Sequence, residues 1–175
     1  MFSAHLLLFV ALAAAPTPAV HAPPTPISSA AAVARYQTAL REATQIELLS
    51  LAAFPHPSTW KGELFHGWPV HGRIVVRSSP DLQKVQQDLA SSLEPRGPDD
   101  PIVGCFLPRH AIVVTTPHER IEALIALDCF SAYIFLDHQL VQGIGPLPSL
   151  ESYLGIRFDA AGIKREPSLR RKGPA

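Results

Sequence analysis

Charge is scarce in this sequence, and neither sign dominates. Charged residues account for 17% of the 175 residues, and 15 basic side chains balance 15 acidic ones to a formal net charge of zero. A chain without net charge generates no overall field that would draw it to nucleic acid or to an acidic membrane surface. We therefore do not expect a nucleic acid partner.

Recognisable catalytic motifs are also missing. The sequence contains no glycine-rich phosphate loop, no G-x-S-x-G turn and no basic–aromatic pattern of the nucleic-acid-binding kind. It contains no internal repeat either. These absences favour a protein that is not an enzyme, and we expect no cofactor.

Basic residues are absent from the start of the chain, where an apolar run stands instead. This run, M-F-S-A-H-L-L-L-F-V-A-L-A-A-A, is followed by the small-residue site V-H-A. It has the length of a signal-peptide core and is shorter than the roughly 20 apolar residues that span a bilayer. It predicts a signal peptide over 1–22, an exported product (periplasmic or secreted) and no stable membrane span after cleavage. Because no Lys or Arg precedes the run, an uncleaved apolar arm is the alternative.

The rest of the chain is predicted to form one domain between two polar ends. A proline-rich lead occupies 23–29, and the domain itself occupies 30–163, in a chain that is 47% hydrophobic and long enough to close a core. From Lys164 to the end there are five basic residues and one acidic residue, which gives this tail a net charge of +4. With so little apolar surface to bury, the tail over 164–175 is predicted to be disordered.

Hydrophobic periodicity and capping residues predict the elements of the domain. Helices are expected over three segments: 30–43, 79–93 and 148–155. Strands are expected in five: 46–54, part of 66–79, 101–116 with a break at Pro108, 121–136, and a short edge strand near 139–143. Ser28 and Ser29 are candidate N-caps of the first helix. In the second strand, Ile74 and Val76 alternate with Arg73, Val75 and Arg77, which predicts one buried and one wetter face. The order of helices and strands predicts an α+β fold with two layers, in which helices pack on one face of an antiparallel sheet of about four to five strands. The edge strand is a candidate surface for a protein partner.

Cysteine is rare, and its two copies lie on the two strands expected to form a hairpin. If that hairpin turns near 117–120, Cys105 and Cys129 come almost opposite each other. In an oxidising compartment such a pair is a disulfide candidate, which requires Cα atoms within roughly 7 Å. Two buried unpaired thiols are one alternative, and a reactive or metal-bound thiol is another.

The stretch C-F-L-P-R-H holds further candidate side chains. We expect Arg109 and His110 to bond the backbone or Asp128, and the alternative is that they bind an anionic ligand. Cys105, His110 and Asp128 would also supply a thiol nucleophile, a base and an orienting acid.

Aromatic and histidine residues near the second predicted strand are weaker candidates. Trp68 could line a ligand groove, although aromatics beside a strand commonly cover the edge of a core. The spacings of ten and five residues among His56, His66 and His71 match no short zinc motif, so no metal site is expected.

The string C-F-L-P-R-H-A-I resembles a family of small bacterial exported or lipoprotein-like proteins to which no function is assigned. In that family C-F-x-P-R-H-A/G-I precedes a strand carrying C-F-E-C, and an F-H-G-aromatic turn comes earlier, here Phe65 to Trp68. The similarity spans about 46–155. The chain departs from the pattern because Ser131 and Ala132 replace the acid and the second cysteine of C-F-E-C. The resemblance implies a fold and an exported location, and it implies no activity.

Together these features favour an exported small globular domain that acts as a non-catalytic binding or scaffold module. The alternative is a thiol- or metal-dependent activity centred on Cys105, Arg109 and His110.

Overall fold

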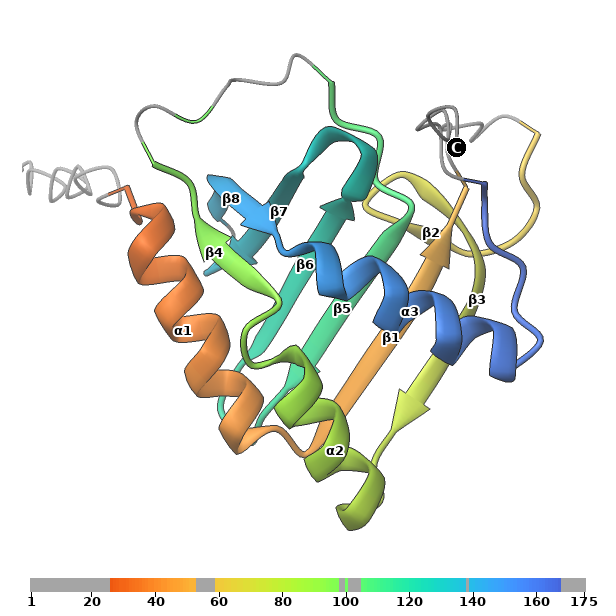
Figure 1. The fold of residues 1–175 in the computed structure, drawn as a ribbon, viewed down its shortest axis with the longest axis horizontal. Helices are drawn as coiled ribbons and strands as arrows, with labels where there is room; N and C mark the ends of the chain where they lie inside the picture. The colour runs from red at the N-terminus through yellow and green to blue at the C-terminus, as the bar shows by residue number, and fades with distance from the viewer. Residues whose placement is uncertain (1–25, 53–58, 98–99, 101–104, 138, 168–175) are drawn as a thin grey trace, which may run out of the picture.

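The computed structural model describes residues 26–52, 59–97, 100, 105–137 and 139–167 (Figure 1). The predicted signal peptide, the first three residues of the proline-rich lead and the last eight residues of the basic tail lie outside these ranges. None of the helices within them has the length and apolarity that a membrane crossing requires.

The described residues form one antiparallel sheet with helices on one of its faces. The eight strands follow the order β2-β3-β1-β5-β6-β7-β8-β4. Their bounds are β1 Gln45–Leu51, β2 Leu64–Phe65, β3 Trp68–Val76, β4 Leu93–Pro95, β5 His110–Thr115, β6 Arg120–Ala126, β7 Ser131–Leu136 and β8 Gln139–Pro146. The helices α1 (Ser29–Glu42), α2 (Ser79–Leu89) and α3 (Pro148–Ala160) lie across the same face (Figure 1). The predicted α+β class with an antiparallel sheet is confirmed.

The predicted number of four to five strands is wrong, because eight strands are present. Two of the added strands, β2 and β4, are two and three residues long, too short to show a periodic pattern. The run over 121–136 also divides into two strands around the short 3-10 helix η1 (Leu127–Cys129). Phe130 ends η1 with φ of 46°, a left-handed conformation that is uncommon for a residue with a side chain.

The helix ends follow the capping signals only in part. The Ser28 hydroxyl accepts a hydrogen bond from the Ala31 amide at 3.2 Å and caps α1 as predicted. The predicted end of α3 at Gly155 is wrong, since the helix continues to Ala160. Gly155 instead allows a close approach, because a Cβ atom there would lie 3.2 Å from a guanidinium nitrogen of Arg165.

Side chains alternate between the two faces of the sheet, as the twofold period of a strand requires. On β1, Ile46 and Leu48 belong to the main core beneath the helices, whereas Leu49 and Leu51 belong to a smaller apolar cluster on the other face. The predicted alternation on β3 is also present, since Val76 is buried and Val75 is exposed. We call the second side the helix-free face.

The predicted edge strand near 139–143 is not the outermost strand. Strand β4 pairs with β8 from Leu93 opposite Pro146 to Pro95 opposite Ile144. The Arg96 amide then donates to the Gly143 carbonyl at 2.9 Å, which continues this pairing. The outer strands of the sheet are β2 and β4.

Candidate ligand-binding site

The two cysteines form a disulfide at the end of the sheet. The Cα atoms of Cys105 and Cys129 are 5.8 Å apart, and the bond joins the segment before β5 to η1. The predicted hairpin produces this pairing, because His110 lies opposite Ile125 in the β5–β6 register. In the strand predicted over 101–116, β5 begins only at His110, and residues 101–104 lie outside the described ranges. With both sulfurs bonded, Cys105 has no thiol to act as a nucleophile.

Next to the disulfide, the Arg109 side chain is buried in an ion pair. Its guanidinium contacts the Asp128 carboxylate, and the two side chains are 4% and 7% exposed. The same guanidinium donates to the backbone carbonyls of Glu166, at 3.4 Å, and of Pro167. Arg109 therefore bonds both the backbone and Asp128, and it links η1 to the C-terminal part of the chain.

We call residues 163–167 the C-terminal strap, because they return from α3 across the sheet. The Ser50 hydroxyl donates to the Lys164 carbonyl at 2.7 Å. The His71 ring bonds the Glu166 carboxylate through Nε2 at 2.7 Å, which lowers the pKa of that carboxyl. The strap includes the first four residues of the tail that was expected to be disordered, and here they make specific contacts.

His110 is buried on the side of the sheet that faces α3. It is 7% exposed and its ring stacks on that of Phe158, with centroids 5.7 Å apart. Burial, together with the charges of Arg109 and Arg165, lowers the pKa of His110 to about 3. Its Nδ1 atom is buried without a hydrogen-bond partner among the described residues. His110 is therefore a neutral imidazole with one unused polar atom.

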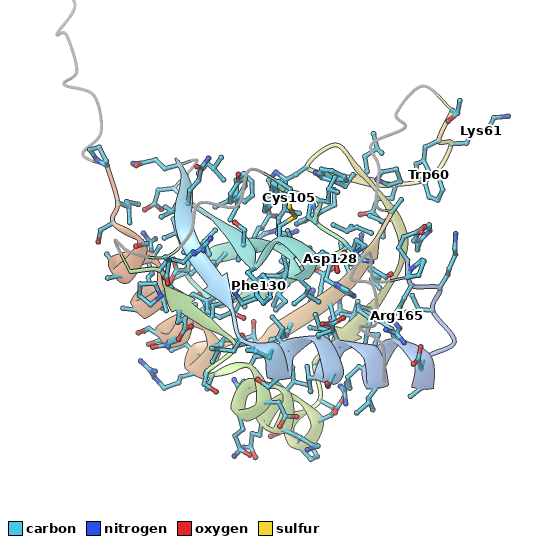
Figure 2. The ribbon with its side chains drawn as sticks, turned by 45° about the horizontal axis from the view of Figure 1, so that its top comes forward. Trp60, Lys61, Cys105, Asp128, Phe130 and Arg165 are labelled. Atoms are coloured by element: carbon cyan, nitrogen blue, oxygen red, sulfur yellow. A yellow bond between two sulfur atoms is a disulfide. The ribbon has the colours of Figure 1, made fainter. Side chains whose placement is uncertain are left out.

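A cavity of about 490 Å³ lies between the sheet, α3 and the strap. It is lined by Arg109, His110 and Leu127 from the sheet side, Glu151 and Asp159 from α3, and all five residues of the strap. Figure 2 shows Arg165 beside α3, with Cys105 and Asp128 at the end of the sheet. We call this space the strap cavity.

The strap cavity is lined by equal numbers of basic and acidic side chains, and not all of them are paired. Arg165 makes two bonds to the Asp159 carboxylate, at 2.9 and 2.7 Å. Glu166 is paired with His71 and with Lys164. Glu151, in contrast, has no hydrogen-bond or ion-pair partner among the described residues. The cavity thus combines two guanidinium groups near His110 with one unpaired carboxylate on α3.

The structure brings two of the three predicted ligand-binding residues together. Arg109 and His110 line the strap cavity, whereas Trp68 packs against the smaller apolar cluster on the helix-free face. Trp68 opens β3 opposite Phe65, and it does not line the strap cavity.

The two described histidines of the group His56, His66 and His71 take part in separate contacts. His66 bonds Glu122 through Nε2 at 2.6 Å and stacks on Phe135, with ring centroids 3.8 Å apart. His71 belongs to the strap, and His56 lies outside the described residues. Across the part of the chain that the structure describes, no group of three or more His, Cys, Asp or Glu side chains could hold a metal ion.

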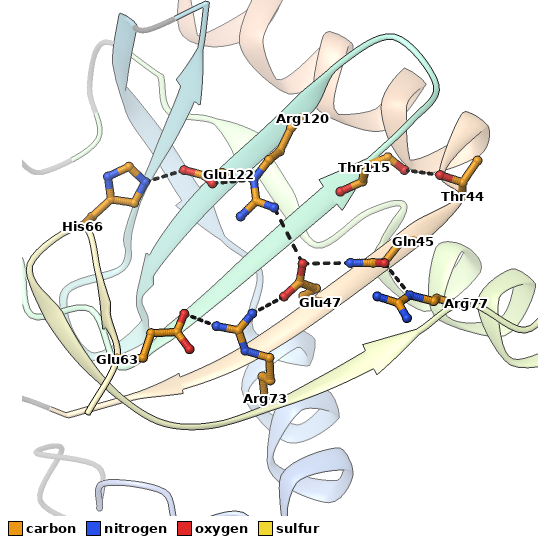
Figure 3. A network of polar contacts seen from close by, with 10 residues as sticks. All are labelled: Thr44, Gln45, Glu47, Glu63, His66, Arg73, Arg77, Thr115, Arg120 and Glu122. Carbon is orange, nitrogen blue, oxygen red and sulfur yellow. Dashed lines mark hydrogen bonds and ion pairs between the residues drawn. The ribbon is translucent and has the colours of Figure 1, made fainter. Parts of the chain in front are cut away.

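The helix-free face carries a second polar network, which the sequence analysis missed (Figure 3). The Glu47 side chain is only 6% exposed and bonds Arg73 at 2.6 Å and Arg120 at 3.7 Å. A cavity of about 370 Å³ lies beside this network. It is lined by His66, Arg120, Glu122, Phe135 and Asp137. Its ionic side chains are already paired, so it offers a ligand fewer unused groups than the strap cavity does.

No protein-family model, curated protein or solved structure matches this chain. The resemblance to the family with the C-F-x-P-R-H string therefore stays a prediction. The case for a function depends on the geometry of the strap cavity. Of its residues, Glu151 and Arg165 were not predicted, because each becomes part of a site only when α3 and the strap meet the sheet.

Proposed function

We propose that this protein is an exported, non-catalytic binding module that holds a small carboxylate-bearing ligand in the strap cavity. One observation carries the proposal: the buried Nδ1 of His110 has no hydrogen-bond partner among the described residues, and His110 lines a cavity of about 490 Å³ together with Arg109 and Arg165. A buried polar atom without a partner costs about 1–3 kcal/mol. A ligand carboxylate that accepts a hydrogen bond from this ring would recover that cost.

The arrangement around His110 supports binding over catalysis. Asp128 pairs with Arg109, so it does not orient the imidazole as the acid of a triad would. Cys105 is oxidised, and a thiol-dependent reaction at this site would need the thiolate. These contacts weigh against the alternative activity centred on Cys105, Arg109 and His110.

The disulfide also supports export. Disulfides persist in oxidising compartments and are rare in the cytosol, where thiols are kept reduced. The apolar run at the start of the chain is the expected signal for such a location. Free-thiol titration of protein isolated from the periplasm or the medium tests this part, and two free thiols would contradict it.

The ligand proposal is tested by calorimetric titration with acetate, succinate and inorganic phosphate. Wild-type protein should bind at least one carboxylate saturably, and His110→Leu should abolish the heat. His118→Leu is the matched control, because His118 is exposed on the β5–β6 turn. If no carboxylate binds, or if both variants behave as the wild type does, the proposal fails.

A further inference from the structure

Two residues that line the strap cavity have a polar group without a partner among the described residues, and they come from different elements. One is the Nδ1 atom of His110, on β5. The other is the carboxylate of Glu151, in the first turn of α3. A ligand that satisfies both must present a hydrogen-bonding anion to one and a cation to the other.

The charges around the two groups have opposite signs. The guanidinium groups of Arg109 and Arg165 lie near His110, where Asp128 and Asp159 pair with them. At the other end Glu151 stands one helical turn before Gly155 and two before Asp159 on the same side of α3. Arg165 bonds Asp159 through Nε and Nη2, whereas its Nη1, the guanidinium nitrogen nearest Gly155, has no hydrogen bond among the described residues. A ligand carboxylate at His110 would therefore leave the charge of Glu151 without a partner, and a cationic group on the same ligand would pair with it.

The helix supplies an estimate of the distance between the two ends. His110 stacks on Phe158, which follows Glu151 by two turns of α3. A rise of 1.5 Å per residue places the two helix positions about 10 Å apart. A free α-amino acid is too short to bridge them, whereas an extended peptide advances by about 3.3–3.6 Å per residue. A chain of two or three residues has the required length.

We infer that the strap cavity takes a short peptide with free ends, whose carboxylate lies at His110 and Arg165 and whose ammonium group lies at Glu151. This inference rests on the proposed function, since it specifies the ligand of the same site. Charge-assisted hydrogen bonds at both ends are stronger than neutral ones, and they would fix the length and direction of the peptide.

Calorimetry with four tripeptide forms tests the inference: free Ala-Ala-Ala, its N-acetyl form, its C-terminal amide and the doubly blocked form. The free tripeptide should bind most tightly, and blocking either end should weaken it by about ten-fold or more. Glu151→Gln should lower the affinity for the free tripeptide to that of the N-acetyl form and leave the latter unchanged. Glu42→Gln is the matched control, because Glu42 is an exposed carboxylate at the end of α1.

The outcomes separate the inference from the proposed function. If the N-acetyl form binds as well as the free tripeptide, the anion site stands and the peptide inference is overturned. If Glu151→Gln weakens both forms equally, the carboxylate is structural and the inference also fails. If neither simple carboxylates nor any tripeptide form binds, both proposals fail together. Unchanged far-UV circular dichroism of Glu151→Gln excludes misfolding as the cause of a loss.

Discussion

Replacing His110 with leucine should flatten the dependence of stability on pH in mild acid. The imidazole is buried against Phe158, and this burial lowers its pKa from the ordinary value of 6.5 to about 3. Between these two values the unfolded chain binds a proton at this residue and the folded chain does not. The stabilisation is therefore complete above the unfolded pKa and is lost progressively as the pH falls toward the folded one.

The size of the effect follows from the same two pKa values. Between about pH 7 and about pH 5, one such residue removes about 2 kcal/mol from the free energy of unfolding. The hydrogen bond from His71 lowers the pKa of Glu166, so the contribution of that carboxyl is lost only below the ordinary carboxyl value of 4.5. Glu166 therefore contributes little to the change above about pH 5. Every other residue is the same in the two proteins, so the comparison isolates the contribution of His110.

Urea unfolding at several pH values, followed by far-UV circular dichroism, measures this difference. Wild-type protein should lose about 2 kcal/mol more than His110→Leu over the window, which corresponds to a difference of about 1 M in midpoint shift. The leucine side chain also alters the free energy of unfolding at neutral pH. The prediction concerns only how steeply that free energy changes with pH. Equal slopes in the two proteins would show that the His110 imidazole titrates normally, and the argument for a neutral buried ring would be wrong.

Three further perturbations test the contacts around the strap cavity. Reduction of the disulfide, which spans 24 residues, should lower the free energy of unfolding by about 3 kcal/mol, measured by urea unfolding with and without reductant. Asp128→Asn should cost about 3–5 kcal/mol in the same assay, because it leaves the buried Arg109 charge without its carboxylate, and a loss below about 1 kcal/mol would contradict a buried pair. Glu166→Gln should release the strap from His71 and speed tryptic cleavage after Arg165, which mass spectrometry can follow. The free energy of global unfolding should change little. An unchanged cleavage rate would mean that other contacts hold the strap.

Patterns within short stretches of the sequence predicted the faces of a strand, the start of a helix and the pairing of a hairpin. The alternation around Ile74 and Val76 indicated the two faces of β3, and Ser28 indicated the start of α1. The hairpin between β5 and β6 was predicted closely enough to place the two cysteines together, because a short turn fixes the register of its strands. These signals lie within one element or between neighbours in the chain.

The parts that were missed depend on contacts between distant residues. Ser50 meets Lys164 across 114 positions and His71 meets Glu166 across 95, and neither pairing leaves a pattern in the sequence. Strand β4 has only three residues, and it forms because β8 offers it an open edge. The composition of the tail, rich in basic residues and proline, therefore predicted disorder. Side chains of the sheet nevertheless bond residues 164–167 and hold them in place.

The disulfide and the strap cavity are connected by a single chain of contacts. The bond to Cys105 holds η1 through Cys129, and η1 carries Asp128. Asp128 holds the Arg109 guanidinium, and Arg109 in turn holds the backbone of the strap at 166–167. The cavity wall therefore depends on an oxidised pair of cysteines that does not itself line the cavity. The disulfide thus fixes the geometry that the binding role proposed for Arg109 and His110 requires.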